Sequence, residues 1–236
     1  MEQLSPRLQA IASLVIPGKS MADIGSDHAQ LPLYLIENGL VPYAVAVELG
    51  DGPYRRALAA ARSHRLGDRI EVRQGDGLQP LAAGETATVV IAGLGGESIA
   101  DILAYDWGKA ESFEKFILQP MTRPAVLRRT LAQRGWLILE EKLLLDRDRF
   151  VVIIVSQPGS IPYPLDPLEA EIGGEALKAD DAVKREYLYQ FTEKYTKIYA
   201  SLNNTDRQDT QPLMAACREK LERLERILNG SYRRGY

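Results

Sequence analysis

The first residues that could do chemistry lie in a turn near the start of the chain. The turn follows the short apolar run 21–24 and reads, in order, Gly25, Ser26, Asp27 and His28. A helical pattern of apolar residues begins soon after it, so the turn joins a strand to a helix. In an open parallel sheet such a turn lies at the crevice where small ligands bind, with free backbone N–H groups directed into it. We therefore expect a ligand site here.

The glycine spacing narrows the class of ligand. A dinucleotide-binding turn needs the pattern Gly-x-Gly-x-x-Gly, and of its three glycines only Gly25 is present. The carboxylate of Asp27 would repel a diphosphate and attract a positively charged ligand. S-adenosylmethionine carries a sulfonium and an ammonium group, and its amino acid end meets this turn in methyltransferases. It therefore fits better than NAD, and a turn that binds nothing is the plain structural alternative.

Two further acids follow the next two predicted strands. Glu48 comes 23 positions after Gly25, where a carboxylate can accept hydrogen bonds from both ribose hydroxyls of an adenosine cofactor. Asp76 lies between two glycines that allow close backbone approach, which suits recognition of the adenine amino group. The alternatives are a solvated acid at a strand end and an ordinary Gly-Asp-Gly turn.

The elements that must position these residues alternate between strand and helix. Four of the predicted strands end in a glycine turn or a ligand-capable residue at the same edge of the sheet, which is stronger evidence than any single motif. Strands are predicted at 21–24, 43–48, 69–73, 87–92 and 115–118, and helices at 5–15, from about 31, at 51–65, after Gly96 and at 124–134.

The end of this sheet distinguishes between fold families. Two strands, Trp136–Leu145 and Phe150–Ser156, are separated by only four residues, which is too short for a helical crossover, so they must pair antiparallel. An alternating sheet that ends in a β-hairpin is typical of class I methyltransferases. The predicted fold class is therefore α/β, a Rossmann-like sheet of parallel strands ending in an antiparallel β-hairpin.

A proline-rich segment at 157–164 marks a boundary, and the sequence beyond it is helical and charged. We expect a methyltransferase domain over 1–160 and a C-terminal helical hairpin over 161–236. Its two apolar stripes are separated by the polar break 203–206.

Composition excludes several classes of protein. The chain has 236 residues, 45% of them hydrophobic, and a net charge of −3, so no global basic field points to nucleic acid. The single Cys217 cannot form an internal disulfide, and no Cys/His cluster has metal-ligand spacing. No export signal or membrane-spanning run is present, so we expect a cytoplasmic protein without a membrane or metal partner and leave its oligomeric state open.

Five motifs follow one another along the first two thirds of the chain. They are 23–29 with Leu31-Pro32, Glu48 with 52–54, Gly75-Asp-Gly-Leu78, Ile91-Ala-Gly-Leu-Gly-Gly96 and Leu118-Gln-Pro120. In this order they resemble the bacterial tRNA (adenine-22, N1)-methyltransferase family. The similarity covers roughly residues 5 to 156, and the tail resembles the family only in architecture.

The resemblance implies an S-adenosylmethionine-dependent enzyme that methylates N1 of adenine in tRNA. The family usually has Met where Leu94 stands and Asn where Met121 stands. By this resemblance, the expected cofactor-binding residues are Gly25, Ser26, Asp27, His28, Glu48, Leu49, Asp76, Gly77, Ala92, Gly93 and Leu94.

Methyl transfer to adenine N1 needs alignment more than a strong base, because N1 exposes a lone pair at neutral pH. Asp27 or the amide of Gln119 could hold the exocyclic amino group, and His28 could accept or relay its proton. His28 can equally be a turn residue satisfied by a neighbour. After the fourth predicted strand the chain lacks the Asn/Asp-Pro-Pro-aromatic motif common in methylases of amino nitrogens.

The RNA contacts are expected on arginine-rich helices and on the hairpin, where residues 177–234 carry twelve bases and nine acids. A solvated surface is the alternative. The arginines of the helices are Arg55, Arg56, Arg62, Arg65, Arg123, Arg128, Arg129 and Arg134.

Several other functions compete with this one. They are a methyltransferase of another RNA, a small molecule or a protein, a non-catalytic RNA-binding module, and more distantly an NAD dehydrogenase.

Overall fold

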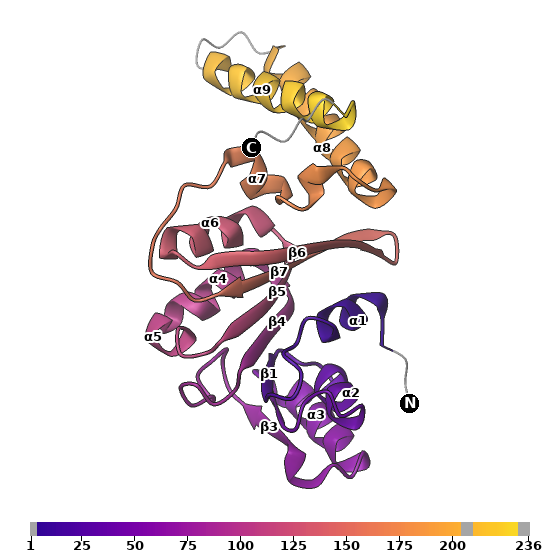
Figure 1. Cartoon of the computed structure of the whole chain (residues 1–236), viewed down its shortest axis with the longest axis vertical. Coiled ribbons are helices and arrows are strands. Elements are labelled where there is room, and N and C mark those ends of the chain that lie inside the picture. Colours follow the sequence, from indigo (N-terminus) through magenta and orange to yellow (C-terminus); the bar gives the residue numbers. More distant parts are fainter. Residues whose placement is uncertain (1–3, 204–209, 231–236) are drawn as a thin grey trace. The chain divides into compact units, whose positions relative to one another are not determined.

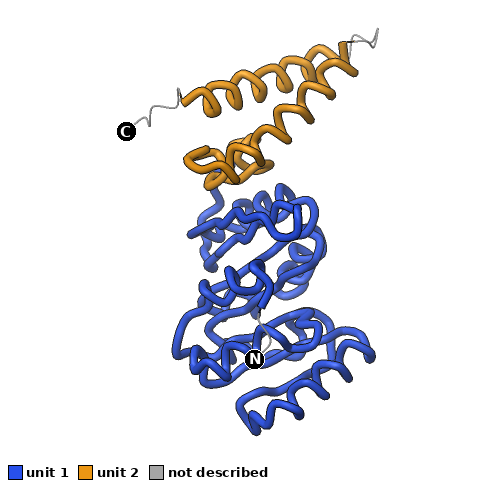
Figure 2. Tube along the Cα trace, turned by 90° about the vertical axis from the view of Figure 1, so that its right-hand side faces the viewer, with its two compact units in different colours: residues 1–165 blue, residues 166–236 orange. Residues whose placement is uncertain are grey.

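The computed structural model describes residues 4–203 and 210–230. Its contacts divide the chain into two compact units, residues 1–165 (unit 1) and 166–236 (unit 2), which Figure 2 colours separately. Within the described residues, no helix combines the length and the apolar composition that a membrane span requires.

Unit 1 is built on one seven-stranded sheet in the order β3-β2-β1-β4-β5-β7-β6. Strands β1 to β5 pair in parallel, and β7 pairs antiparallel with both β5 and β6. The strands are β1 (Met21–Ile24), β2 (Ala44–Glu48), β3 (Ile70–Gln74), β4 (Thr88–Gly95), β5 (Lys115–Thr122), β6 (Leu137–Asp146) and β7 (Arg149–Gln157).

Helices cover both faces of this sheet, with α1–α3 on one side and α4–α6 on the other (Figure 1). The interior strands β1 and β2 are buried along their whole length, as expected for a parallel sheet covered on both faces. The helical elements of unit 1 are α1 (Pro6–Ala12), α2 (Gln30–Glu37), α3 (Asp51–Ser63), η1 (Gly67–Arg69), α4 (Gly96–Tyr105), α5 (Trp107–Ala110) and α6 (Pro124–Arg134).

The predicted β-hairpin is confirmed. Strands β6 and β7 pair antiparallel from Leu137↔Gln157 to Asp146↔Arg149, and a two-residue turn joins them. Because β6 runs in the same direction as β1 to β5, this turn lies at the edge of the sheet where the parallel strands end. The arrangement is the predicted Rossmann-like methyltransferase fold.

Two local predictions are corrected by the structure. Strands β4 and β5 continue past the expected stops, because Leu94 pairs with Pro120 and Gly95 with Thr122 through a bulged register. The sequence Asp51-Gly52-Pro53 also predicts Asp51 as an N-cap, but helix α3 begins at Asp51 with Gly50 as its N-cap, so Asp51 is a first-turn residue. Its carboxylate instead accepts from Arg55 Nε at 3.1 Å.

Unit 2 consists of α7 (Pro167–Ile172), η2 (Ala176–Lys178), α8 (Ala182–Asn203) and α9 (Gln211–Leu228). Helices α8 and α9 lie side by side (Figure 2) and bury Tyr195 and Cys217 between them, where Cys217 Sγ donates to Tyr195 O at 3.1 Å. Of the predicted polar break, Asn203 ends α8, and residues 204–206 lie outside the described residues.

Candidate active site

The turn after β1 has an unusual backbone. Gly25 has a φ of 72°, which glycine adopts freely, but Asp27, His28 and Ala29 follow with φ of 33°, 65° and 55°. Each such residue other than glycine costs on the order of 1 kcal/mol, and such strain concentrates at ligand-binding sites. The hydroxyl of Ser26 donates to Asp23 Oδ2 at 2.6 Å and ties the turn to the end of β1.

Two buried carboxylates lie beneath this turn. Burial raises the pKa of Asp23 to about 6, even though the Ser26 hydroxyl favours its charged form. Burial also raises the pKa of Glu48, whose side chain is only 5% exposed and whose other neighbours include Asp27, Arg56 and His28.

The buried Glu48 suits a ribose. Among the described residues, Glu48 Oε1 has no hydrogen-bond partner, and leaving a buried carboxylate oxygen unpaired is costly. Ribose hydroxyls are donors that can supply the missing hydrogen bond. The residues present therefore fit an adenosine cofactor at the end of β2.

Asp27 differs from the expectation. Its side chain is 68% exposed, and Oδ1 lies 3.2 Å from Arg56 Nη2 and 3.6 Å from His28 Nε2. The sequence predicts that this carboxylate attracts a positively charged ligand. Because Arg56 compensates that charge, the attraction of this turn for a cation is weaker than predicted.

A cavity of about 400 Å³, the donor cavity, lies between the ends of β2, β3 and β4 and helix α4. Four predicted cofactor-binding residues line it, and each follows or ends a strand. They are Leu49, Asp76, Gly77 and Leu94. A Cβ on Gly77, whose φ is 51°, would lie 2.9 Å from Ile102 Cγ2, so glycine is required for this close packing.

Sequence reasoning missed the wall of the donor cavity that α4 supplies. Four residues of α4 face the cavity, and their spacing of three or four residues places them on one side of a helix. That spacing is the sequence signal that could have indicated this wall. They are Ser98, Asp101, Ile102 and Tyr105.

A second cavity in unit 1, of about 610 Å³, is called here the hairpin cavity. Its walls come from α1, from the ends of β4 and β5, and from the β6–β7 turn. The residues are Arg7, Gly93, Gln119, Pro120, Met121, Asp146, Arg147, Arg149, Phe150 and Val151.

Gln119 is buried at the floor of the hairpin cavity, and its oxygen is fully used. Oε1 accepts from Arg7 Nη1 at 3.0 Å and from the backbone N–H of Gly93 at 3.1 Å, while Nε2 lies 3.5 Å from Met121 Sδ. The oxygen that would accept from an exocyclic amino group is therefore already saturated. Arg7, which the sequence did not single out, holds Gln119 from a position 112 residues away.

The predicted site residues thus fall into three neighbouring groups. Gly25, Ser26, Asp27 and His28 form the strained turn beside Glu48, and Leu49, Asp76, Gly77 and Leu94 line the donor cavity. Gly93 and Gln119 line the hairpin cavity, while Ala92 precedes Gly93 in β4.

Several arginines expected on the RNA surface are engaged within unit 1. Arg128 is the clearest correction, because it is 1% exposed and its Nε lies 2.6 Å from Glu141 Oε1. The remaining ion pairs join Arg55 to Asp51, Arg56 to Asp27, Arg123 to Glu97 and Arg134 to Glu111.

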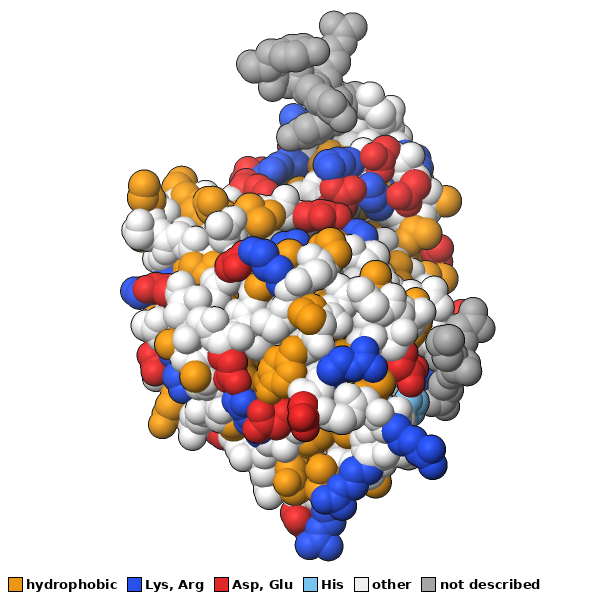
Figure 3. All heavy atoms as spheres, turned by 60° about the horizontal axis from the view of Figure 1, so that its bottom comes forward, with side chains coloured by type: hydrophobic (Ala, Val, Ile, Leu, Met, Phe, Trp, Pro, Cys, Tyr) orange, Lys and Arg blue, Asp and Glu red, His pale blue; other side chains and the backbone are white. Residues whose placement is uncertain are grey.

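Lys and Arg side chains also gather at the lower edge of the face shown in Figure 3. Arg62 and Arg65 are exposed at the end of α3, as expected for arginines that could contact RNA.

Over residues 4–203 and 210–230, no group of three or more His, Cys, Asp or Glu side chains is placed to hold a metal ion.

Comparisons with known proteins show the family of this chain. Residues 4–154 match the family described as a methyltransferase domain. The chain is 30% identical over 232 residues to the tRNA (adenine(22)-N(1))-methyltransferase of Bacillus subtilis, which covers 96% of this chain and 98% of that protein.

Solved structures give the same result. The Bacillus subtilis M1A22 tRNA methyltransferase TrmK superposes with a TM-score of 0.85 at 29% identity, covering 96% of this chain and 99% of that one. A Streptococcus pneumoniae protein in complex with S-adenosyl-L-methionine superposes with a TM-score of 0.78 at 30% identity, covering 96% and 100%. This chain therefore belongs to the bacterial tRNA (adenine(22)-N(1))-methyltransferase family.

Proposed function

We propose that this chain transfers the methyl group of S-adenosylmethionine to N1 of adenine 22 in tRNA, in the cytoplasm. The observation that carries the proposal is the extent of the similarity to the Bacillus subtilis enzyme, which spans 96% of this chain and 98% of that protein. The likeness therefore includes the C-terminal hairpin as well as the domain that holds the donor site.

The residues proposed to bind the methyl donor lie at the ends of the parallel strands. Glu48 accepts from the ribose hydroxyls, and Asp76 accepts from the adenine amino group inside the donor cavity. Leu49 and Ile102 line the same cavity and offer apolar surface to the adenine ring. When bound, S-adenosylmethionine supplies an electrophilic methyl group on a positively charged sulfur.

The acceptor side needs alignment. The lone pair of adenine N1 attacks the methyl carbon, the carbon–sulfur bond breaks, and its electron pair stays on sulfur. The positive charge moves to the base, so the product is N1-methyladenine as a cation beside a neutral thioether. Holding the two reactants in line supplies most of the acceleration.

Asp27, His28 and Gln119 keep proposed roles around this reaction. His28 lies beside Asp27 on the strained turn, where the pair can take up a proton from the methylated base. Gln119 fixes the backbone N–H of Gly93 and the guanidinium of Arg7, so it positions the wall between donor and acceptor. Gly25, Ser26, Gly77, Ala92 and Leu94 complete the donor site.

Residues 161–236 brace the tRNA in this proposal, but not through a simple positive charge. Residues 166–176, at the start of unit 2, add four acids to the twelve bases and nine acids of residues 177–234. Residues 166–236 therefore carry twelve bases and thirteen acids. Several of its bases pair internally, including Arg223 with Asp166 and Lys184 with Glu175. Any contact with RNA must use particular side chains of the hairpin.

The test is to incubate the protein with S-adenosylmethionine and an unmodified tRNA transcript, then to identify the product nucleoside and its position by mass spectrometry. We expect N1-methyladenine at position 22 and none in a matched transcript with guanine at that position. Methylation at another nucleotide, or only of a small molecule or a protein, would overturn the substrate assignment.

A further inference from the structure

The hairpin cavity and the donor cavity meet at one strand end. Gly93 lines the hairpin cavity, and the next residue of β4, Leu94, lines the donor cavity. Groups bound in the two cavities are therefore separated by a single stretch of backbone. A volume of about 610 Å³ is within the range of pockets that hold small organic ligands.

The outer wall of the hairpin cavity comes from the β6–β7 turn. Figure 1 shows this long hairpin extending past the neighbouring strands on the side where α1 lies. The turn therefore brings side chains from the last strands of unit 1 to the carboxyl ends of β4 and β5. Arg147, Arg149 and Phe150 from this region line the cavity together with Arg7 of α1.

The backbone of the turn is strained. Arg147 and Asp148 occupy its two central positions with φ of 48° and 61°. Two-residue hairpin turns of this kind favour Asn-Gly, because both positions need a left-handed conformation. The chain therefore keeps an arginine where a smaller residue would be more stable, and backbone strain of this kind is typical of functional sites.

Among the described residues, no ion pair holds the two arginines of this wall, although Asp146 also lines the cavity. Within the described part of the chain, neither Arg147 nor Arg149 forms an ion pair, although Asp146 and Asp148 are their neighbours in sequence. This contrasts with Arg56 and Arg128, which both face carboxylates. A guanidinium group matches the geometry of a phosphate and binds it through two hydrogen bonds.

We propose that the hairpin cavity receives the acceptor nucleotide of an RNA strand, with Arg147 and Arg149 binding the phosphates beside it and Phe150 contacting the base. This inference rests on the proposed function and names the part of the site that takes the RNA. A base must leave its stack for its N1 to reach the donor, and aromatic and guanidinium groups favour such unstacked bases. Gln119 and Arg7 form the floor that directs the base toward Gly93.

The test compares variants of the turn in the full-length protein. Arg147→Asn combined with Asp148→Gly supplies the favoured turn and removes one guanidinium, so we expect a higher melting temperature but about tenfold weaker binding of an unmodified tRNA transcript. The plot of log affinity against log salt should flatten by about one. Asp148→Gly alone is the matched control, because it relieves the same turn and keeps Arg147.

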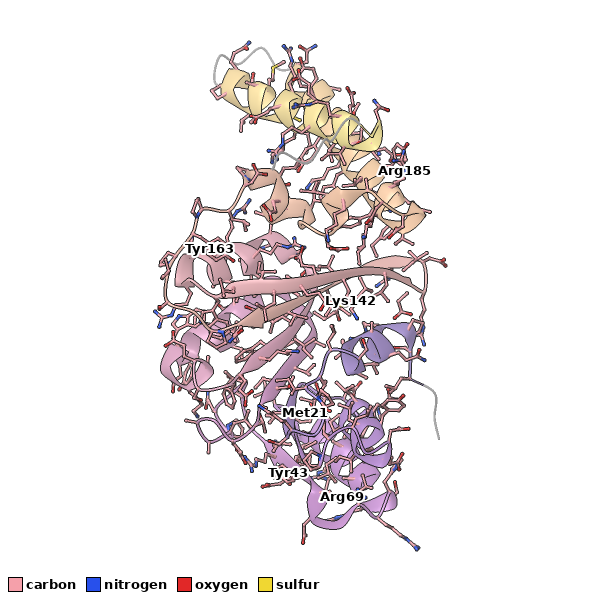
Figure 4. All side chains as sticks on the ribbon, in the orientation of Figure 1. Met21, Tyr43, Arg69, Lys142, Tyr163 and Arg185 are labelled. Carbon is pink, nitrogen blue, oxygen red and sulfur yellow. The ribbon has the colours of Figure 1, made fainter. Side chains whose placement is uncertain are left out.

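Further variants separate the remaining parts. Arg149→Ala should weaken tRNA binding to a similar extent, and Phe150→Leu should lower the single-turnover methylation rate. Arg69→Ala should change neither property, since Arg69 lies at the other end of unit 1 from Lys142 of β6 (Figure 4). The affinity for S-adenosylmethionine, measured by calorimetry, should stay the same in every variant.

Two results are decisive against the inference. If the wild-type protein methylates tRNA but the Arg147 and Arg149 variants bind it with unchanged affinity and salt dependence, the hairpin cavity is not the acceptor site and the proposed function stands. If the wild-type protein binds S-adenosylmethionine but methylates no tRNA, the proposed function fails and this inference fails with it.

Discussion

Two carboxylates beside the proposed donor site are buried in surroundings that disfavour their charge. Glu48 is buried with one oxygen unpaired among the described residues, and Asp23 is buried beside it at the end of the neighbouring strand. In the protein without ligand this arrangement reduces stability, because a buried anion lacks the solvation that water would give. In the proposed complex, ribose hydroxyls restore part of that solvation, so donor binding and stability are linked at Glu48.

The first prediction concerns Glu48. Glu48→Gln should weaken S-adenosylmethionine binding by about 1 to 3 kcal/mol, because an amide is a poorer acceptor than a carboxylate for two hydroxyl groups. Stability without ligand should not fall, because the variant removes a buried charge. Calorimetric titration and urea unfolding measure the two effects. Glu114→Gln on the surface is the control, and equal affinity in both variants would exclude Glu48 from the site.

The second prediction concerns pH and Asp23. Burial raises the pKa of Asp23 from 3.8 to about 6, so the folded protein holds this proton more tightly than the unfolded chain. The contribution to the free energy of unfolding is therefore fully present below about pH 4 and is lost as the pH rises through 6. This difference between the two pKa values corresponds to about 3 kcal/mol in the free energy of unfolding.

Asp23→Asn isolates this contribution, because Asn stays neutral and can still accept from Ser26. We expect the variant to be more stable than wild type at pH 7 and the difference to shrink toward pH 4, measured by urea unfolding at several pH values. A difference that is independent of pH would show that Asp23 does not titrate in this range.

At the scale of elements, a buried ion pair joins α6 to β6. Arg128 Nε and Glu141 Oε1 are 2.6 Å apart, and both side chains are almost fully removed from solvent. Such a pair contributes little net stability compared with apolar residues, but removing one partner leaves an uncompensated buried charge.

We therefore expect Arg128→Ala to destabilise the protein by about 3 to 5 kcal/mol in chemical unfolding. Arg128→Met combined with Glu141→Leu should recover most of that loss. Arg129→Ala, one position away on the exposed side of α6, should change the free energy of unfolding by less than about 0.5 kcal/mol. A double variant as unstable as Arg128→Ala would mean that packing volume, and not charge, sets the cost.

The elements were largely predictable because their signals are local. Apolar runs mark the buried strands, and the four-residue spacing at 146–149 forces the antiparallel hairpin. The ends of β4 and β5 were not predictable. Gly93 and Pro120 are residues that usually end a strand, but pairing between β4 and β5 continues past them. Arg7 and Arg128 could not be assigned, because their partners lie 112 and 13 positions away.

At the scale of the whole molecule, the two units divide the proposed work. The donor cavity and the hairpin cavity are lined entirely by residues of unit 1, whereas unit 2 contains the helical hairpin and its internal ion pairs. Affinity for the donor and affinity for tRNA should therefore respond differently to loss of unit 2.

A chain ending at Leu165 tests this division. We expect its affinity for S-adenosylmethionine to stay within about twofold of the full chain, and kcat/KM for tRNA to fall at least tenfold because bracing contacts are lost. Calorimetry and initial-rate measurements give the two values, and circular dichroism checks that the shortened protein is folded. Unchanged kcat/KM would limit tRNA recognition to unit 1.

Cys217 gives the protein a natural reporter. It is the only cysteine in the chain, it is packed against Tyr195 between α8 and α9, and burial raises the pKa of its thiol. The residue is only 5% exposed, so a thiol-reactive dye should label it faster when the two helices separate, and the labelling rate reports on opening of the hairpin. Slower labelling of Cys217 in the presence of tRNA would show that bound tRNA keeps the two helices together, and the measurement needs no engineered probe.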